Sequence, residues 1–172
     1  MKTLFLLRHA KSSWKDLSLA DFDRPLKKRG KEAARSIGRL FKEEKIFPGL
    51  ILCSSARRTR ETIKIVRETA ELPSELRYEQ RIYEGNSMTL LAVLGEVNSS
   101  IGSVLMVGHN PGMENLLELL TGRALRMPTA ALAKINLDVE NWTELLEHGQ
   151  LEWLVKPGTP LHAKDPGTVK LA

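Results

Sequence analysis

Four side chains suited to phosphate chemistry follow three short apolar runs of the chain. Arg8 and His9 come directly after the first run, Arg58 lies five residues after the second, and His109 lies two residues after the third. A guanidinium presents a planar fork of donors that matches phosphate oxygens, and a neutral imidazole can act as a nucleophile. If the three runs are neighbouring parallel strands, their carboxyl ends meet at one edge of a sheet, where α/β proteins form their sites. The residues therefore predict one phosphate-binding pocket.

The hydrophobic pattern predicts the elements that would position these side chains. Short apolar runs typical of buried strands alternate with segments whose apolar residues recur at helical spacing. Strands are expected at 3–7, 50–53, 76–78 and 103–107, and helices at 30–44, between the capping pair Ser54-Ser55 and Pro73, at 87–97 and at 113–120. Two late strands are expected at 128–139 and 151–155. This succession predicts an α/β fold, a three-layer α/β/α sandwich with a mainly parallel sheet and an antiparallel edge.

Length and composition limit the class of protein. The chain has 172 residues, of which 42% are hydrophobic, and this fits one domain over residues 1–172 with an irregular tail from about Pro157. No apolar run reaches the ~18 residues that a membrane span needs, and the N-terminus does not read as a secretory leader. The single cysteine, Cys53, permits no internal disulfide. We therefore expect a cytoplasmic protein, monomeric and with no membrane partner.

Positive charge is concentrated in the first half of the chain. There are 20 Lys and Arg against 11 Asp and Glu through Arg81, and 6 against 10 from Ile82 onward, within a net charge of +5. Such a balance suggests an anionic partner, which could be nucleic acid, an acidic protein face or a phosphorylated substrate, but charge alone favours a set of solvated helix faces. No basic strand with interleaved aromatic residues and no recognition-helix pattern occurs, so we expect no nucleic-acid partner.

Several other phosphate chemistries are excluded by the sequence. No Gly-x-x-x-x-Gly-Lys-[Ser/Thr] motif occurs. A thiol phosphatase would need Cys-x5-Arg, but the residue six positions beyond Cys53 is Thr59. The pair Asp21 and Asp23 follows no apolar strand, as an aspartyl-phosphate enzyme would require. The four histidines lack the spacing of metal ligands, so we expect no metal and no cofactor. Histidine remains as the nucleophile.

Four segments in order carry a family resemblance. They are Arg8-His9-Ala10-Lys11-Ser12-Ser13-Trp14, Asp23-Arg24-Pro25-Leu26, Ile82-Tyr83-Glu84 and Val107-Gly108-His109-Asn110-Pro111-Gly112. Together they resemble the histidine phosphatase superfamily, whose fold is phosphoglycerate-mutase-like, and more closely its SixA-like phosphohistidine phosphatases. The resemblance runs from about residue 2 to residue 120. The resemblance implies a phosphoglycerate-mutase-like fold for this chain.

The resemblance also implies roles for individual residues. His9 would attack phosphorus and carry the phosphoryl group as a covalent intermediate, while Arg8, Arg58 and His109 would bind the phosphate oxygens. Ser12 is a further candidate for phosphate contact. Glu84 is the best candidate for a general acid, and a purely structural carboxylate is the alternative.

Three functions remain open at this stage. The resemblance implies a phosphatase of phosphohistidine in proteins, with a histidine phosphotransfer domain as the expected substrate. The same residues would serve a phosphatase of small phosphate esters. A module that binds a phosphorylated or acidic partner without turnover is the alternative from a different class. One departure from the family bears on the site, because Lys15 stands where many relatives carry Asn as a phosphate contact.

Overall fold

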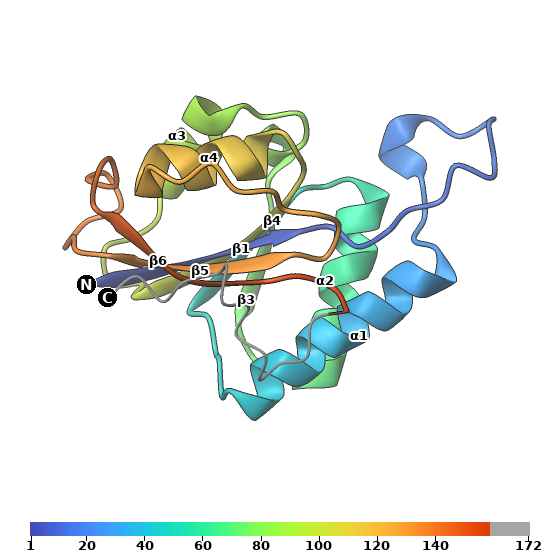
Figure 1. Ribbon diagram of the computed structural model, residues 1–172, viewed down its shortest axis with the longest axis horizontal. Helices are drawn as coiled ribbons and strands as arrows, with labels where there is room; N and C mark the ends of the chain where they lie inside the picture. The colour runs from blue at the N-terminus through green and yellow to red at the C-terminus, as the bar shows by residue number, and fades with distance from the viewer. Residues whose placement is uncertain (159–172) are drawn as a thin grey trace.

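Six strands form one mixed sheet in the computed structural model, which describes residues 1–158 (Figure 1). Their order across the sheet is β3-β2-β4-β1-β5-β6. The bounds are β1 Lys2–Arg8, β2 Leu50–Cys53, β3 Glu75–Tyr78, β4 Ser103–Gly108, β5 Leu132–Leu137 and β6 Gly149–Val155. The first four strands are parallel, whereas β5 runs antiparallel to β1 and β6 antiparallel to β5. The late strands thus form the antiparallel edge that the sequence predicts.

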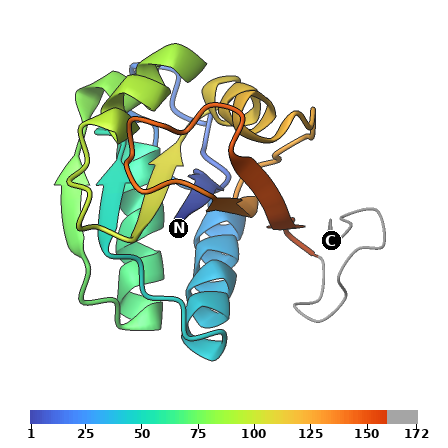
Figure 2. The same cartoon turned by 90° about the vertical axis from the view of Figure 1, so that its left-hand side faces the viewer.

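Two helices cover each face of the sheet, so the predicted three-layer sandwich is confirmed (Figures 1 and 2). Helices α1 Lys28–Glu43 and α2 Arg57–Ala70 pack on one face, and α3 Ser87–Gly95 and α4 Gly112–Thr121 pack on the other. Two short 3-10 helices, η1 Asp21–Asp23 and η2 Gln80–Ile82, lie in the connecting loops. Within residues 1–158, no helix is long and apolar enough to cross a bilayer.

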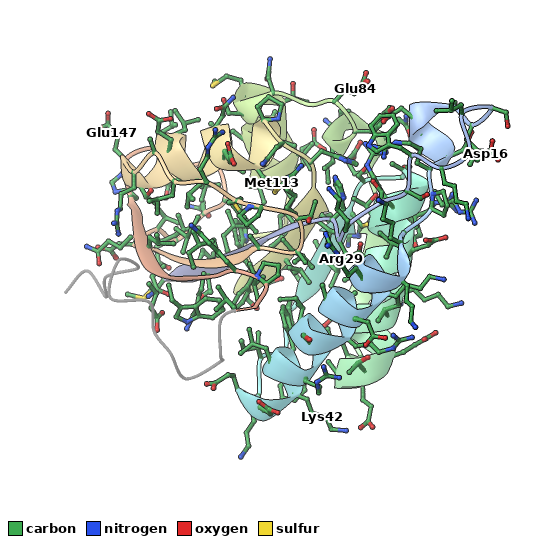
Figure 3. All side chains as sticks on the ribbon, turned by 45° about the vertical axis from the view of Figure 1, so that its right-hand side comes forward. Asp16, Arg29, Lys42, Glu84, Met113 and Glu147 are labelled. Carbon is green, nitrogen blue, oxygen red and sulfur yellow. The ribbon has the colours of Figure 1, made fainter. Side chains whose placement is uncertain are left out.

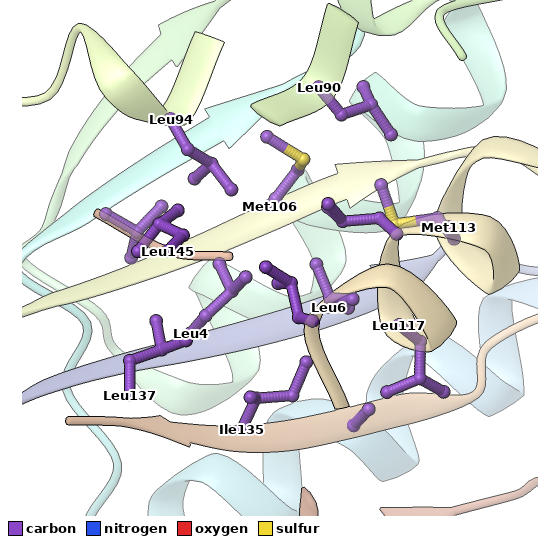
Figure 4. Close-up of a cluster of buried hydrophobic side chains, with 14 of the residues drawn as sticks. Leu4, Leu6, Leu90, Leu94, Met106, Met113, Leu117, Ile135, Leu137 and Leu145 are labelled. Atoms are coloured by element: carbon purple, nitrogen blue, oxygen red, sulfur yellow. The ribbon is translucent and has the colours of Figure 1, made fainter. Parts of the chain in front are cut away.

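The alternation of side chains along β1 explains why its apolar run is uninterrupted. Leu4 and Leu6 pack against the α3 and α4 layer, and Phe5 and Leu7 pack against the α1 and α2 layer. Figure 4 shows Leu4 and Leu6 in the first of these clusters. Because successive side chains of a strand point to opposite faces, a strand covered on both faces needs apolar residues at every position. Strand β1 is therefore a central strand, and it holds the residues that follow it rigidly.

The helix boundaries differ from the sequence prediction at α2. Its N-cap is Ala56, so Ser54 and Ser55 do not cap it as expected. The helix ends at Ala70, its C-cap Glu71 takes a left-handed backbone (φ 55°), and Pro73 follows two residues later. The predicted irregular tail lies almost wholly outside the described residues.

A loop between β1 and α1 projects beyond the sheet (Figure 1). Its two sides are joined at the base by a bridge between Ser12 and Leu26 and by a hydrogen bond from the Ser13 N–H to the Pro25 carbonyl (2.8 Å). Figure 3 shows Asp16 near the far end of this loop. The loop is therefore an ordered extension at the carboxyl edge of the sheet.

Candidate active site

The three strands that precede the predicted site residues are neighbours in the sheet. Strand β4 lies between β2 and β1, and all three are parallel, so their carboxyl ends meet at one edge (Figure 2). The register places Arg8 opposite Gly108, and the His9 N–H donates to the Gly108 carbonyl at 3.0 Å. The rings of His9 and His109 lie side by side as a result, with centroids 5.2 Å apart. The sheet itself brings the two imidazoles together.

His9 is a buried, neutral imidazole with a fixed tautomer. Its Nδ1 lies 2.8 Å from the Ala10 carbonyl oxygen, which can only accept, so Nδ1 carries the proton and Nε2 carries the lone pair. Burial is the main cause that lowers the pKa of His9 to about 3. The neighbouring His109 and the positive charges of Arg58 and Arg8 also lower this pKa. The ring therefore presents an uncharged, nucleophilic Nε2 at neutral pH.

A serine hydroxyl orients His109. Its Nε2 lies 2.7 Å from the Ser54 hydroxyl, which already accepts a hydrogen bond from the Ala56 N–H. When the Ser54 hydroxyl donates to Nε2, the His109 proton lies on Nδ1, the same nitrogen that carries the proton in His9. Burial, together with the nearby positive charge of Arg58, lowers the pKa of His109 to about 3. Ser54, whose sequence position suggested a helix cap, instead orients this imidazole.

The guanidiniums of Arg8 and Arg58 are each anchored through their Nη atoms. The Arg8 Nη1 donates to the Met127 carbonyl at 3.1 Å. The Arg58 Nη1 donates to the Asp21 carbonyl at 2.7 Å, and its Nη2 donates to the Asp21 carboxylate at 3.1 Å. The Nε atom of each guanidinium is buried, and no described residue accepts a hydrogen bond from it.

The partnerless donors of the site form a set. Besides the Nε atoms of Arg8 and Arg58, the His109 Nδ1 is buried without a partner among residues 1–158. Buried donors without partners are rare and cost roughly 1–3 kcal/mol each. Three of them around a neutral His9 fit an anion with several acceptor oxygens, because each donor would then be satisfied. A tetrahedral phosphoryl group has this character.

Comparison with known proteins agrees with this arrangement. A sequence model of the histidine phosphatase superfamily (branch 1) matches residues 4–88. The fold matches that of an Agrobacterium tumefaciens protein assigned as the phosphohistidine phosphatase SixA, with a TM-score of 0.78 and 30% sequence identity over 91% of this chain and 99% of that one. The chain belongs to the histidine phosphatase superfamily.

Two further relatives extend the comparison. The protein histidine phosphatase SixA in complex with tungstate matches with a TM-score of 0.78 and 25% identity, over 90% of this chain and 97% of that chain. An uncharacterized chloroplastic protein of Arabidopsis thaliana is 30% identical over 93% of this chain and 80% of its own length. Membership of the histidine phosphatase superfamily supports phosphatase activity for this chain, and the resemblance to SixA-like members is confirmed.

The site of this histidine phosphatase contains a carboxylate that the sequence pattern does not predict. Asp21 accepts from the Arg24 Nε (3.0 Å), from the Arg58 Nη2 (3.1 Å) and from the Tyr83 hydroxyl (2.8 Å). Partial burial raises the pKa of Asp21, but the Tyr83 hydroxyl and the two guanidiniums outweigh it and bring the pKa to about 2. Asp21 is thus an ionised anchor that holds Arg58 in place. The one sequence signal that could have indicated this role is the i,i+3 spacing between Asp21 and Arg24, which allows an ion pair.

Two predicted site residues stand apart from the cluster. The Ser12 hydroxyl accepts from the Arg24 Nη1 at 2.8 Å, so it orients a neighbour of the site. Glu84 is exposed, has a left-handed backbone (φ 59°) and makes no hydrogen bond or ion pair among the described residues. Figure 3 shows its side chain at the outer surface, pointing away from the sheet. Lys15 is likewise exposed in the projecting loop.

Proposed function

We infer that this histidine phosphatase removes phosphate from phosphohistidine in proteins through a covalent intermediate on His9. The observation that carries the proposal is the set of buried, partnerless donors on Arg8, Arg58 and His109 around a neutral imidazole. The names of the two SixA structures, which refer to phosphohistidine and to protein histidine, support the choice of substrate.

The proposed reaction has two in-line steps. In the first, the His9 Nε2 lone pair forms a bond to phosphorus while the bond to the substrate imidazole breaks, and that imidazole leaves as a neutral ring once it has taken a proton from water. In the second, water attacks the phosphorylated His9, which releases inorganic phosphate and restores the neutral ring. Arg8, Arg58 and His109 stabilise the charge on the phosphoryl oxygens, and the loss of one such donor typically costs about 10²–10³ in rate.

The acid–base character of the site favours an imidazole leaving group over an alkoxide. Asp21 is the carboxylate tied directly to Arg58, and its pKa of about 2 makes it a poor proton donor at neutral pH. Glu84 is exposed and makes no hydrogen bond or ion pair among the described residues. An alkoxide needs a general acid to leave, whereas a phosphorylated imidazole can be protonated by solvent beforehand. This supports phosphohistidine as the substrate and not alkyl phosphate esters.

One experiment separates the proposal from its alternatives. Purified protein is mixed with radiolabelled phosphohistidine peptide and quenched, and the adduct is tested for acid lability and alkali stability. We expect a labelled adduct in the wild type and in His148→Ala, which changes an exposed histidine, but none in His9→Ala. Binding of the peptide without adduct or phosphate release would identify a binding module.

The leaving group is tested with a series of substrates. Aryl phosphates of decreasing phenol pKa should react progressively faster, and alkyl phosphates should react far more slowly than phosphohistidine peptide, because no general acid assists. A flat dependence on leaving-group pKa, with alkyl phosphates turned over as fast as the peptide, would favour a phosphatase of small esters.

A further inference from the structure

A basic groove that the proposed reaction does not use runs along the outer side of α2. It is a hollow of about 430 Å³ between that helix and the edge strand β3. Tyr78 of β3 is one of its lining residues. Four cations also line it, namely Arg57, Arg60, Lys64 and Arg67. We call this hollow the α2 groove.

The carboxylates of the α2 groove do not neutralise its central cations. Glu61 accepts from the Arg57 Nε (2.9 Å) and from the Leu26 N–H (2.8 Å), so both of its oxygens are engaged. Arg60 and Lys64 are exposed and form no ion pair within the described part of the chain. Glu68 is the other carboxylate of the groove, so its four cations outnumber its two carboxylates. The centre of the groove is thus an unpaired, accessible cationic surface.

The wall of the groove is preformed. The Arg67 Nη2 donates to the Ser74 carbonyl at 3.1 Å, which fixes this cation against the loop that leads into β3. Tyr78 is half-exposed beside Arg60 and Arg67, whose charges both act on its hydroxyl. A partner would therefore meet one fixed cation, Arg67, and an aromatic surface next to the exposed Arg60 and Lys64.

The groove begins at the edge of the sheet where the active site lies. Its first cation, Arg57, is the residue before Arg58, at the N-terminus of α2 and at the carboxyl edge of the sheet. The four cations are spaced three, four and three residues apart, so they share one side of the helix. Over ten residues, at 1.5 Å of rise each, this row extends about 15 Å along α2 away from that edge. That length exceeds a single anion and suits a strip of protein surface.

We propose that the α2 groove binds an acidic segment of the phosphorylated protein whose phosphohistidine enters the site, a proposal that rests on the proposed function. Carboxylates of the partner would face Arg60 and Lys64 while its phosphoryl group reaches Arg58. Complementary charge of this kind speeds encounter and favours the correct partner, and salt weakens it. The active site then selects the phosphoryl group, and the groove selects the protein that carries it.

The test uses three synthetic phosphohistidine peptides with the same core and with acidic, neutral or basic flanks. The groove variant is Arg60→Glu/Lys64→Glu. The matched control is Arg35→Glu/Arg39→Glu, which reverses two exposed cations of α1 at the same i,i+4 spacing. We expect wild type and control to prefer the acidic over the neutral peptide by about tenfold in kcat/KM. The groove variant should bring this ratio to about one or below, and added salt should reduce it in the wild type.

The outcomes separate the groove from the proposed function. An acidic-to-neutral ratio that is the same in all three proteins would overturn the groove while leaving the phosphatase intact. If the wild type hydrolyses no peptide, the proposed function fails, and fluorescence anisotropy of a labelled, unphosphorylated acidic peptide decides the groove. Binding lost only in the groove variant supports it. Equal binding by groove variant and wild type, or displacement by a single-stranded oligonucleotide at lower concentration than by acidic peptide, overturns it.

Discussion

The two buried imidazoles should make this protein lose stability in mild acid. His9 and His109 each have a pKa of about 3 in the folded state, against about 6.5 in an unfolded chain. Because the folded pKa is the lower of the two, the unfolded state binds more protons between these values, and the free energy of unfolding falls as pH falls. The loss begins near pH 6.5 and is complete below about pH 3.

The size of the loss follows from the two pKa values. Each unit of pH below 6.5 removes up to about 1.4 kcal/mol per histidine, so each ring contributes about 2 kcal/mol between pH 7 and pH 5 and the pair about 4 kcal/mol. Asp21 acts in a different window. Its pKa is lowered on folding, so its stabilisation is present above about pH 4 and is lost as pH falls toward 2. The range from pH 7 to 5 therefore isolates the imidazoles.

Urea unfolding at pH 7, 6 and 5 measures this effect. In His109→Gln, one of the two titrating rings is gone, and the loss between pH 7 and 5 should fall to about half of the wild-type value. His148→Gln, at an exposed position, should keep the wild-type slope. A wild-type free energy of unfolding that stays constant from pH 7 to 5 would refute the assignment of neutral, buried rings.

Three further substitutions test the site and its support. Asp21→Asn removes the carboxylate charge beside the Arg58 Nη2 and leaves the backbone carbonyl contact to its Nη1, so the guanidinium is held less firmly and kcat/KM on an aryl phosphate should fall about tenfold; a change below twofold would contradict this. Ser54→Ala removes the hydroxyl that bonds to His109, so kcat should fall by about tenfold and ¹⁵N shifts of that ring should show mixed tautomers; a single tautomer with unchanged kcat would contradict this. Leu6→Ala should cost about 2–5 kcal/mol in urea unfolding, whereas Leu17→Ala on the exposed loop should change stability by less than about 0.5 kcal/mol.

The sequence predicted most of the sheet and the central residues of the site because both depend on local patterns. Uninterrupted apolar runs such as residues 4–7 mark strands that are buried on both faces. Placing Arg8, His9 and His109 at strand ends then requires only that the strands be parallel neighbours, which the alternation of strands and helices favours. The late antiparallel pair followed from the same reasoning.

The residues that support the site could not be predicted, since their partners are distant in the chain. Asp21 lies in a loop without periodicity, and its contacts with Arg58 and Tyr83 depend on how that loop folds back over the sheet edge. Ser54 precedes a helix and was interpreted as its cap, but the helix begins after Ala56 and the hydroxyl serves His109. Glu84 carries the family motif, yet its left-handed backbone belongs to an outward-facing turn.

The position of the first strand has a consequence for biosynthesis. Both neighbours of β1 are made late, because it pairs with Ser103–Gly108 on one side and Leu132–Leu137 on the other. A nascent chain therefore carries a fully apolar segment with no hydrogen-bonding neighbour until most of the polypeptide has left the ribosome, and such a segment is prone to aggregate or to occupy chaperones. Catalytic competence should emerge in a single late step, and any fragment that stops short of β5 should be both inactive and poorly soluble.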